Sequence, residues 1–207
     1  MGLDLMLFMA DWKYLSALPV EKRTEALEDA AFPPLKPDCE YPRGRRDGGW
    51  VWLPDPETAW CAEYEFNTTT GAYRPHSHAG DAWDDMRPLV DAFLREAVDT
   101  FLIDLIWQAN PADDPALTSG GRFFPAATDR RHPRVLLACP PEAMPGKARA
   151  WTQVQSRLEA LREPFDLECE GWAGRPSTFN DFTTLLGEWG AVTTEAARRG
   201  WGLVGLP

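Results

Sequence analysis

Two histidines separated by one residue are the side chains most able to do chemistry. His76 and His78 flank a serine, and an acidic stretch that begins at Asp81 follows them. In an extended segment, residues two apart point to the same face. Both imidazoles could then bind one metal ion, with carboxylate oxygens from Asp81, Asp84 or Asp85 completing the site. Imidazole with carboxylate suits zinc, iron or nickel, so this pattern is compatible with a small metal-dependent hydrolase.

The same residues also fit a solvated loop that leads into a helix, with Asp81 as the helix cap. No other catalytic motif accompanies them, because the sequence has neither a GxSxG elbow nor a GK[ST] phosphate loop. Its four cysteines form no CxxC pair, and their spacing is typical of reduced, inert thiols. We therefore predict no cofactor and no resident metal, and we keep the hydrolase as the alternative function.

A second candidate site combines arginine with tryptophan. Arg43, Arg45 and Arg46 precede Trp50 and Trp52. On a strand, the two tryptophans would face one side. Tryptophan and arginine are the residue types in which protein interfaces concentrate binding energy. These five residues, together with His76, His78 and Asp81, are the candidate binding residues. The competing interpretation is that both tryptophans cover the core beneath the proline-rich loop that precedes them.

Charge narrows the class of partner. The net charge of the 207 residues is −11, and residues 81–114 carry nine acids against two arginines. Such a chain repels nucleic acid and anionic membranes, whereas it suits a basic protein partner. No apolar run reaches the roughly 20 residues of a membrane helix. The start also lacks the basic and long apolar regions of a secretory signal. We expect a cytoplasmic location, and we predict a non-enzymatic binding or interaction protein, of which an immunity-type protein is one form.

The pattern of apolar residues predicts a helix-rich α+β fold in a single domain over residues 1–207. Its small sheet includes an N-terminal and a C-terminal strand. We expect strands near residues 3–9, 50–53, 57–66, 134–138 and 201–206, and loops over residues 33–49, 67–80 and 110–133. The excess of arginine over lysine, with abundant alanine, glycine and proline, is typical of a protein from a GC-rich bacterial genome.

Four helices complete the predicted fold. Apolar residues at three- and four-residue steps place them over residues 20–31, 81–107, 146–163 and 178–199. Pro88 should begin or kink the second helix, and Pro164 should end the third. The last helix carries the clearest boundaries, since Thr178 can cap its start and Gly200 suits its exit. Trp189 lies on its apolar face, so we expect this helix to belong to the core.

Short motifs spread along the chain resemble the YfbM-like bacterial proteins. They are MGLDLMLF at the start, DAWDDMRPLV, a GGR loop leading to PRVLLACPPEAM, a helix ending in EPFD, and the final FNDF and EAARRGWGLVGL. In that family a strand-like start, an aspartate–tryptophan helix, a proline–glutamate helix start and a terminal helix–glycine–strand follow in this order. The segment around residues 33–49 departs from the pattern as a long insert. The resemblance implies a compact α+β fold and carries over no activity.

Overall fold

The computed structural model describes residues 3–32, 48–52, 58–108, 123–125 and 135–207. Five strands form one antiparallel sheet in the order β2-β3-β1-β5-β4. Near the two ends of the chain, β1 and β5 lie side by side, with Met6 opposite Leu206 and Ala10 opposite Gly202. The helix-rich α+β class with terminal strands is therefore confirmed. The strands are β1 (Met6–Ala10), β2 (Gly49–Trp52), β3 (Cys61–Glu65), β4 (Leu137–Cys139) and β5 (Gly202–Leu206).

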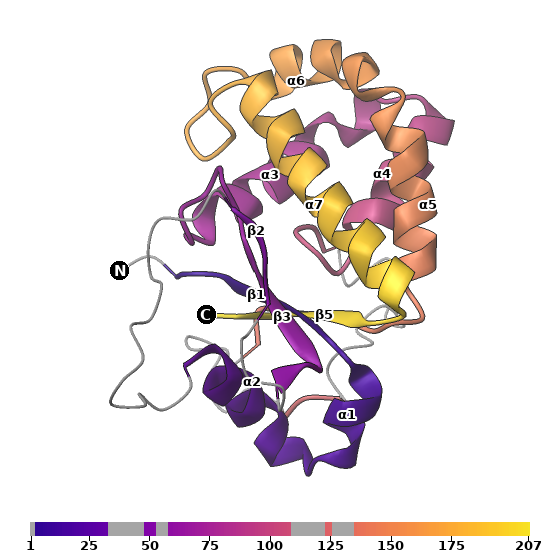
Figure 1. Ribbon diagram of the computed structural model, residues 1–207. Coiled ribbons are helices and arrows are strands. Elements are labelled where there is room, and N and C mark those ends of the chain that lie inside the picture. The colour runs from indigo at the N-terminus through magenta and orange to yellow at the C-terminus, as the bar shows by residue number, and fades with distance from the viewer. Residues whose placement is uncertain (1–2, 33–47, 53–57, 109–122, 126–134) are drawn as a thin grey trace.

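The sheet lies between two helical layers of unequal size (Figure 1). Alternate residues of β1 face opposite layers, because side chains alternate along a strand. Leu7 and Met9 belong to the larger core beneath α3–α7, and Phe8 and Ala10 to the smaller one shared with α1 and α2. The α-helices are α1 (Trp12–Ala17), α2 (Arg23–Ala31), α3 (Arg74–Met86), α4 (Ala92–Leu102), α5 (Met144–Gln155), α6 (Arg162–Glu168) and α7 (Phe179–Arg199).

The last helix, α7, follows the sequence prediction closely. The Thr178 hydroxyl accepts a hydrogen bond from the backbone N–H of Asp181 at 3.1 Å, which caps the helix start. Gly200 ends it in the left-handed conformation with φ 68°, which glycine adopts without steric penalty. The inner face is fully buried against the sheet and neighbouring helices; it includes Phe182, Leu185, Leu186, Trp189, Val192 and Ala196.

The predicted loop over residues 67–80 and the predicted helix that follows it differ in the structure. Residues 67–80 are not all loop, because α3 begins at Arg74 with Pro75 in its first turn, where the missing N–H of proline is tolerated. The predicted helix over residues 81–107 is two helices, α3 and α4, separated by the 3₁₀ turn η3 (Arg87–Leu89). This break shifts the apolar phase. Phe93 is therefore 60% exposed, although the three- and four-residue spacing of apolar residues over 81–107 predicts it on the buried face of a single helix.

The third predicted helix is also divided. Helix α5 ends at Gln155 and is followed by the 3₁₀ turn η5 (Leu158–Leu161) and then by α6. Pro164 was expected to end the helix, but it lies within the first turn of α6. A proline is compatible with this position because the first-turn N–H groups have no partner within the helix.

A buried lysine joins α4 to α5. The Nζ of Lys147 on α5 donates to the carbonyls of Thr100, Phe101 and Ile103 at the end of α4, at 3.2 Å and 3.4 Å for the first two. A cation is favourable there because the last carbonyls of a helix lack partners and carry the negative end of its dipole. Burial lowers the pKa of Lys147. This side chain therefore fixes the relative position of the two helices.

Two glycines of α7 should respond to alanine with opposite signs. A Cβ at Gly190 would lie 2.0 Å from Cε2 of Trp151, whereas nothing lies within 4 Å of the corresponding position at Gly187. We expect Gly190→Ala to destabilise the protein by about 1–3 kcal/mol through overpacking. Gly187→Ala should stabilise it by up to about 1 kcal/mol through helix propensity. Urea unfolding measures the free energy of unfolding of both variants. Equal changes in the same direction would contradict the close packing of Gly190 against Trp151.

Candidate functional site

His76 lies in α3 and is buried among aromatic rings. Its Nδ1 accepts a hydrogen bond from Nε1 of Trp189 at 3.1 Å, and the Phe66 ring centroid lies 4.5 Å away. Within the part of the chain that the structure describes, Nε2 has no hydrogen-bond partner. Burial lowers the pKa of His76 to about 3. The imidazole is therefore neutral near neutral pH, and it packs in the core rather than facing solvent.

His78 points to another side of the same helix. Residues two apart on an α-helix are separated by about 200° around its axis, so the shared face expected for an extended segment is absent. His78 is half-buried, and its Nε2 accepts from Nε of Arg74 at 3.2 Å. Asp81 is not a helix cap; it lies within α3, 3.7 Å from NH1 of Arg175. Among the described residues, no group of three or more His, Cys, Asp or Glu side chains could hold a metal ion.

The described cysteines are buried free thiols. Burial raises the pKa of Cys61 and of Cys139 to about 12, and that of Cys169 to about 11. Since the thiolate is the reactive form, none of the three is prepared for nucleophilic catalysis. Cys39 lies outside the described residues.

The two tryptophans of β2 face the larger helical layer but have different surroundings. Trp50 is half-buried and packs edge-on against Tyr64, with ring centroids 5.0 Å apart. Trp52 is 43% exposed, and the guanidinium of Arg199 lies 4.0 Å from its ring centroid. Thus Trp52 does contact an arginine, although one from the end of α7 that no local pattern near residue 50 could indicate. Arg43, Arg45 and Arg46 lie outside the described residues.

The acidic stretch over residues 81–114 is partly neutralised by ion pairs. Asp99 accepts from Nε and NH2 of Arg87, both at 2.8 Å. Asp91 pairs with Arg157 at 2.8 Å, and the backbone N–H of Leu94 together with this guanidinium lowers the pKa of Asp91. These carboxylates therefore contribute less negative charge to the surface than the composition of the segment indicates.

A more open acidic surface lies on α6 and the loop that follows it. We call it the α6 surface. Its inner neighbours Pro164 and Phe165 are buried, while Leu167 is 66% and Trp172 70% exposed. Within the described residues, no ion pair engages its four carboxylates. The α6 surface consists of Glu163, Asp166, Leu167, Glu168, Glu170 and Trp172, all exposed.

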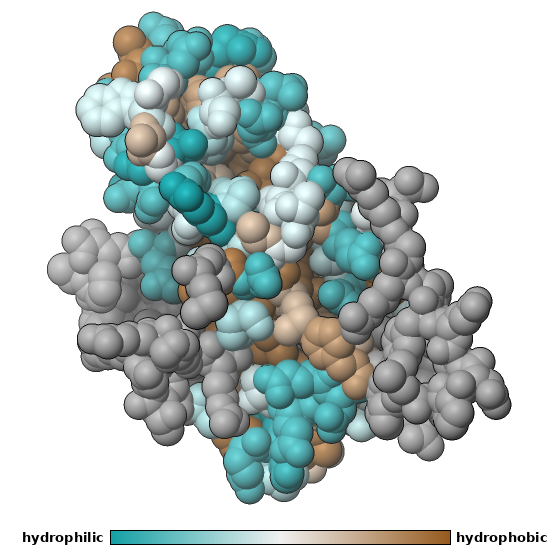
Figure 2. All heavy atoms as spheres, turned by 90° about the vertical axis from the view of Figure 1, so that its left-hand side faces the viewer, coloured by the Kyte–Doolittle hydropathy of each residue, from teal (hydrophilic) through white to brown (hydrophobic). Residues whose placement is uncertain are grey.

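Contacts with α3 and α7 hold this surface in place. The Phe165 ring packs against those of Phe179 and Phe182, and Sγ of Cys169 donates to the carbonyl of Ala82 at 3.6 Å. Hydrophilic side chains cover most of the upper part of the face in Figure 2, over the helical layer, with few apolar ones among them. The acids of EPFDLECE are visible in the sequence, but the helix end expected at Pro164 left no predicted helix on which to place them.

Comparison with protein-family models, with curated proteins and with solved structures finds no match to this chain. The relationship to the YfbM-like proteins thus stays a prediction from short motifs. Within the described residues, no helix has both the length and the apolar composition needed to cross a membrane. Function must therefore be argued from the chemistry of the surface.

Proposed function

We propose that this chain is a non-enzymatic, protein-binding protein of the bacterial cytoplasm, and that its α6 surface contacts a basic partner. One observation carries the proposal. Four carboxylates without an ion-pair partner among the described residues lie on α6 and the loop after it, the same short segment that carries Leu167 and Trp172, the two most exposed large apolar side chains there. Interfaces that select a partner by its charge combine apolar residues, which supply affinity, with charged residues around them.

The two kinds of side chain have different roles in such a contact. Burying the exposed area of Trp172 and Leu167 contributes affinity, since apolar burial gives about 25 cal/mol per Å². The carboxylates accelerate association with a basic protein and repel acidic ones. An immunity-type protein that neutralises a basic toxin is one concrete form of this function.

The loop that carries Trp172 is held before any partner binds. The backbone N–H of Trp172 donates to the carbonyl of Cys169 at 3.1 Å. Arg175 anchors the far end of the loop, since it pairs with Asp85 on α3 at 2.6 Å. Because the surface is already ordered, binding loses little conformational entropy in this loop.

Affinity purification tests the proposal, with the chain attached to the resin at a position away from the α6 surface so that this surface faces solution. The wild-type chain should retain a protein of high isoelectric point, and moderate salt should weaken this retention. Trp172→Ala should lower the affinity at least about tenfold, because truncating a central interface tryptophan typically costs more than about 1.4 kcal/mol. The double change Glu163→Lys with Asp166→Lys should abolish retention.

Leu89→Ala is the matched control, since Leu89 is also an exposed apolar residue but lies in the turn η3. Exposed substitutions of this kind usually change stability by less than about 0.5 kcal/mol, so all variants should remain folded. The proposal would be overturned if the wild type retained no partner or only an acidic one. It would also be overturned if every variant retained a basic partner equally well.

A further inference from the structure

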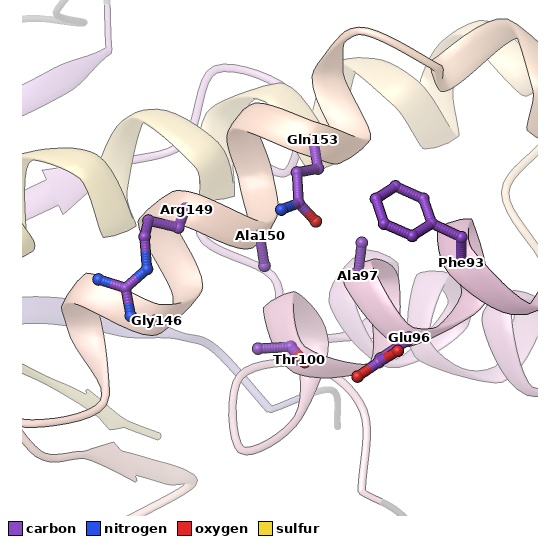
Figure 3. A pocket seen from close by; sticks show the side chains of 8 residues that line it. All are labelled: Phe93, Glu96, Ala97, Thr100, Gly146, Arg149, Ala150 and Gln153. Atoms are coloured by element: carbon purple, nitrogen blue, oxygen red, sulfur yellow. The ribbon is translucent and has the colours of Figure 1, made fainter.

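A groove with a volume of about 320 Å³ runs between α4 and α5. It is independent of the α6 surface and of the residues singled out from the sequence. Figure 3 shows the eight residues that line it, four from each helix. They are Phe93, Glu96, Ala97 and Thr100 of α4, and Gly146, Arg149, Ala150 and Gln153 of α5.

Small residues make the floor of this groove. Ala97 and Ala150 are buried where the two helices meet. At Gly146, nothing lies within 4 Å of the position that a Cβ would occupy, so the space above it is open. The contacts of Lys147 with the end of α4 hold the helices together. The groove is therefore already formed in the folded chain, as most small-molecule sites are.

The two ends of the groove have different chemistry. Arg149 lies at one end and the exposed ring of Phe93 at the other, with Gln153 between them (Figure 3). No described carboxylate forms an ion pair with Arg149. Its planar guanidinium is suited to bind a carboxylate with two parallel hydrogen bonds, and Phe93 presents a ring for stacking.

We propose that this groove binds a small organic acid with one carboxylate and an aromatic body. The carboxylate lies on Arg149, the carbon chain crosses Ala97 and Ala150, and the ring packs against Phe93. Glu96 also lines the groove, and its negative charge disfavours a second carboxylate on the ligand. The site thus selects aromatic monocarboxylates over dicarboxylates and over neutral analogues.

Titration with 3-phenylpropionate, followed by amide NMR shifts of the full chain, tests the site. Saturable shifts should map to α4 and α5, with a dissociation constant in the millimolar range that is usual for ligands of this size. Phenylsuccinate, which adds a second carboxylate, and the neutral 3-phenylpropanamide should each bind at least about tenfold more weakly.

Two substitutions separate this site from nonspecific attraction. Arg149→Gln should weaken binding at least about tenfold, and Gly146→Leu should abolish it by filling the groove. Two control variants should leave the affinity for 3-phenylpropionate unchanged. Arg95→Gln on α4 removes one positive charge outside the groove. Gly187→Leu introduces a leucine at another open helical glycine. Absence of saturable binding, equal binding of the amide, or unchanged affinity in Arg149→Gln would overturn the proposal. Arg149 is exposed, so that variant should fold even where Gly146→Leu does not.

Discussion

Replacing Trp189 with alanine is expected to lower the free energy of unfolding by about 3–5 kcal/mol, the usual effect of truncating a buried large aromatic residue. The indole is fully buried in the larger core and packs against Phe66, with ring centroids 5.1 Å apart. Its Nε1 donates to His76 at 3.1 Å. The change therefore leaves a cavity and also removes the hydrogen bond of a buried imidazole nitrogen, which is costly in itself.

Urea unfolding of the purified variant measures this loss. Because whole domains are stable by only about 5–15 kcal/mol, Trp189→Phe should be studied beside it. Phenylalanine keeps an aromatic ring and removes only the N–H donor and part of the volume, so it should lose less stability and remain folded. Trp172→Ala, at an exposed tryptophan, is the control and should change little. A loss below about 1 kcal/mol for Trp189→Ala would show that the indole does not hold the core.

The elements at the two ends of the chain could be predicted from sequence because their signals are local. Thr178 and Gly200 mark the ends of α7, and the apolar spacing between them fixes its buried face. The short apolar run of β1 is bounded by Asp11, which caps α1 by accepting from the N–H of Lys13 at 2.8 Å. That short helix was not predicted, since six residues give too little periodicity to recognise.

The start of α3 could not be predicted because tertiary contacts determine it. Proline, histidine, serine and glycine over residues 74–80 favour a turn. In the structure, His76 gains its hydrogen bond from α7, 113 residues away. Gly80 allows the carbonyl of Ile106 to approach so closely that a Cβ would lie 2.0 Å from its oxygen. Neither contact leaves a local trace in the sequence.

The α6 surface and the groove were not found from sequence for the same reason, because tertiary contacts determine them. Both depend on a change in helical phase. The turn η3 rotates Phe93 out of the core, and the break after Gln155 allows Pro164 to lie inside a new helix. A proline alone does not reveal whether it ends one helix or lies in the first turn of the next. The packing of Phe165 on α7 decides this here.

Lowering the pH from about 7.5 to about 5 is expected to remove roughly 2 kcal/mol of stability through His76 alone. Its pKa is about 3 in the folded chain, compared with about 6.5 when unfolded. Between these values the unfolded state binds a proton that the native state does not, so unfolding becomes more favourable as the pH falls. The loss approaches about 1.4 kcal/mol per pH unit below the unfolded pKa. Above about pH 6.5 the full stability is present.

Urea unfolding of the wild type and of His76→Gln at several pH values measures how the free energy of unfolding changes with pH. The range stays above about pH 5 because most carboxylates titrate below it; Glu195, paired with Arg198 and Arg199, has its pKa lowered to about 2. His76→Gln should be less stable at neutral pH and lose most of the pH dependence. His78→Gln should keep it, because desolvation of the half-buried His78 lowers its pKa less than full burial lowers that of His76. Equal slopes in the wild type and His76→Gln would show that His76 reaches solvent and can be protonated without unfolding. An accessible imidazole of that kind would be available as a base, which is one of the roles that the alternative hydrolase function would require of His76.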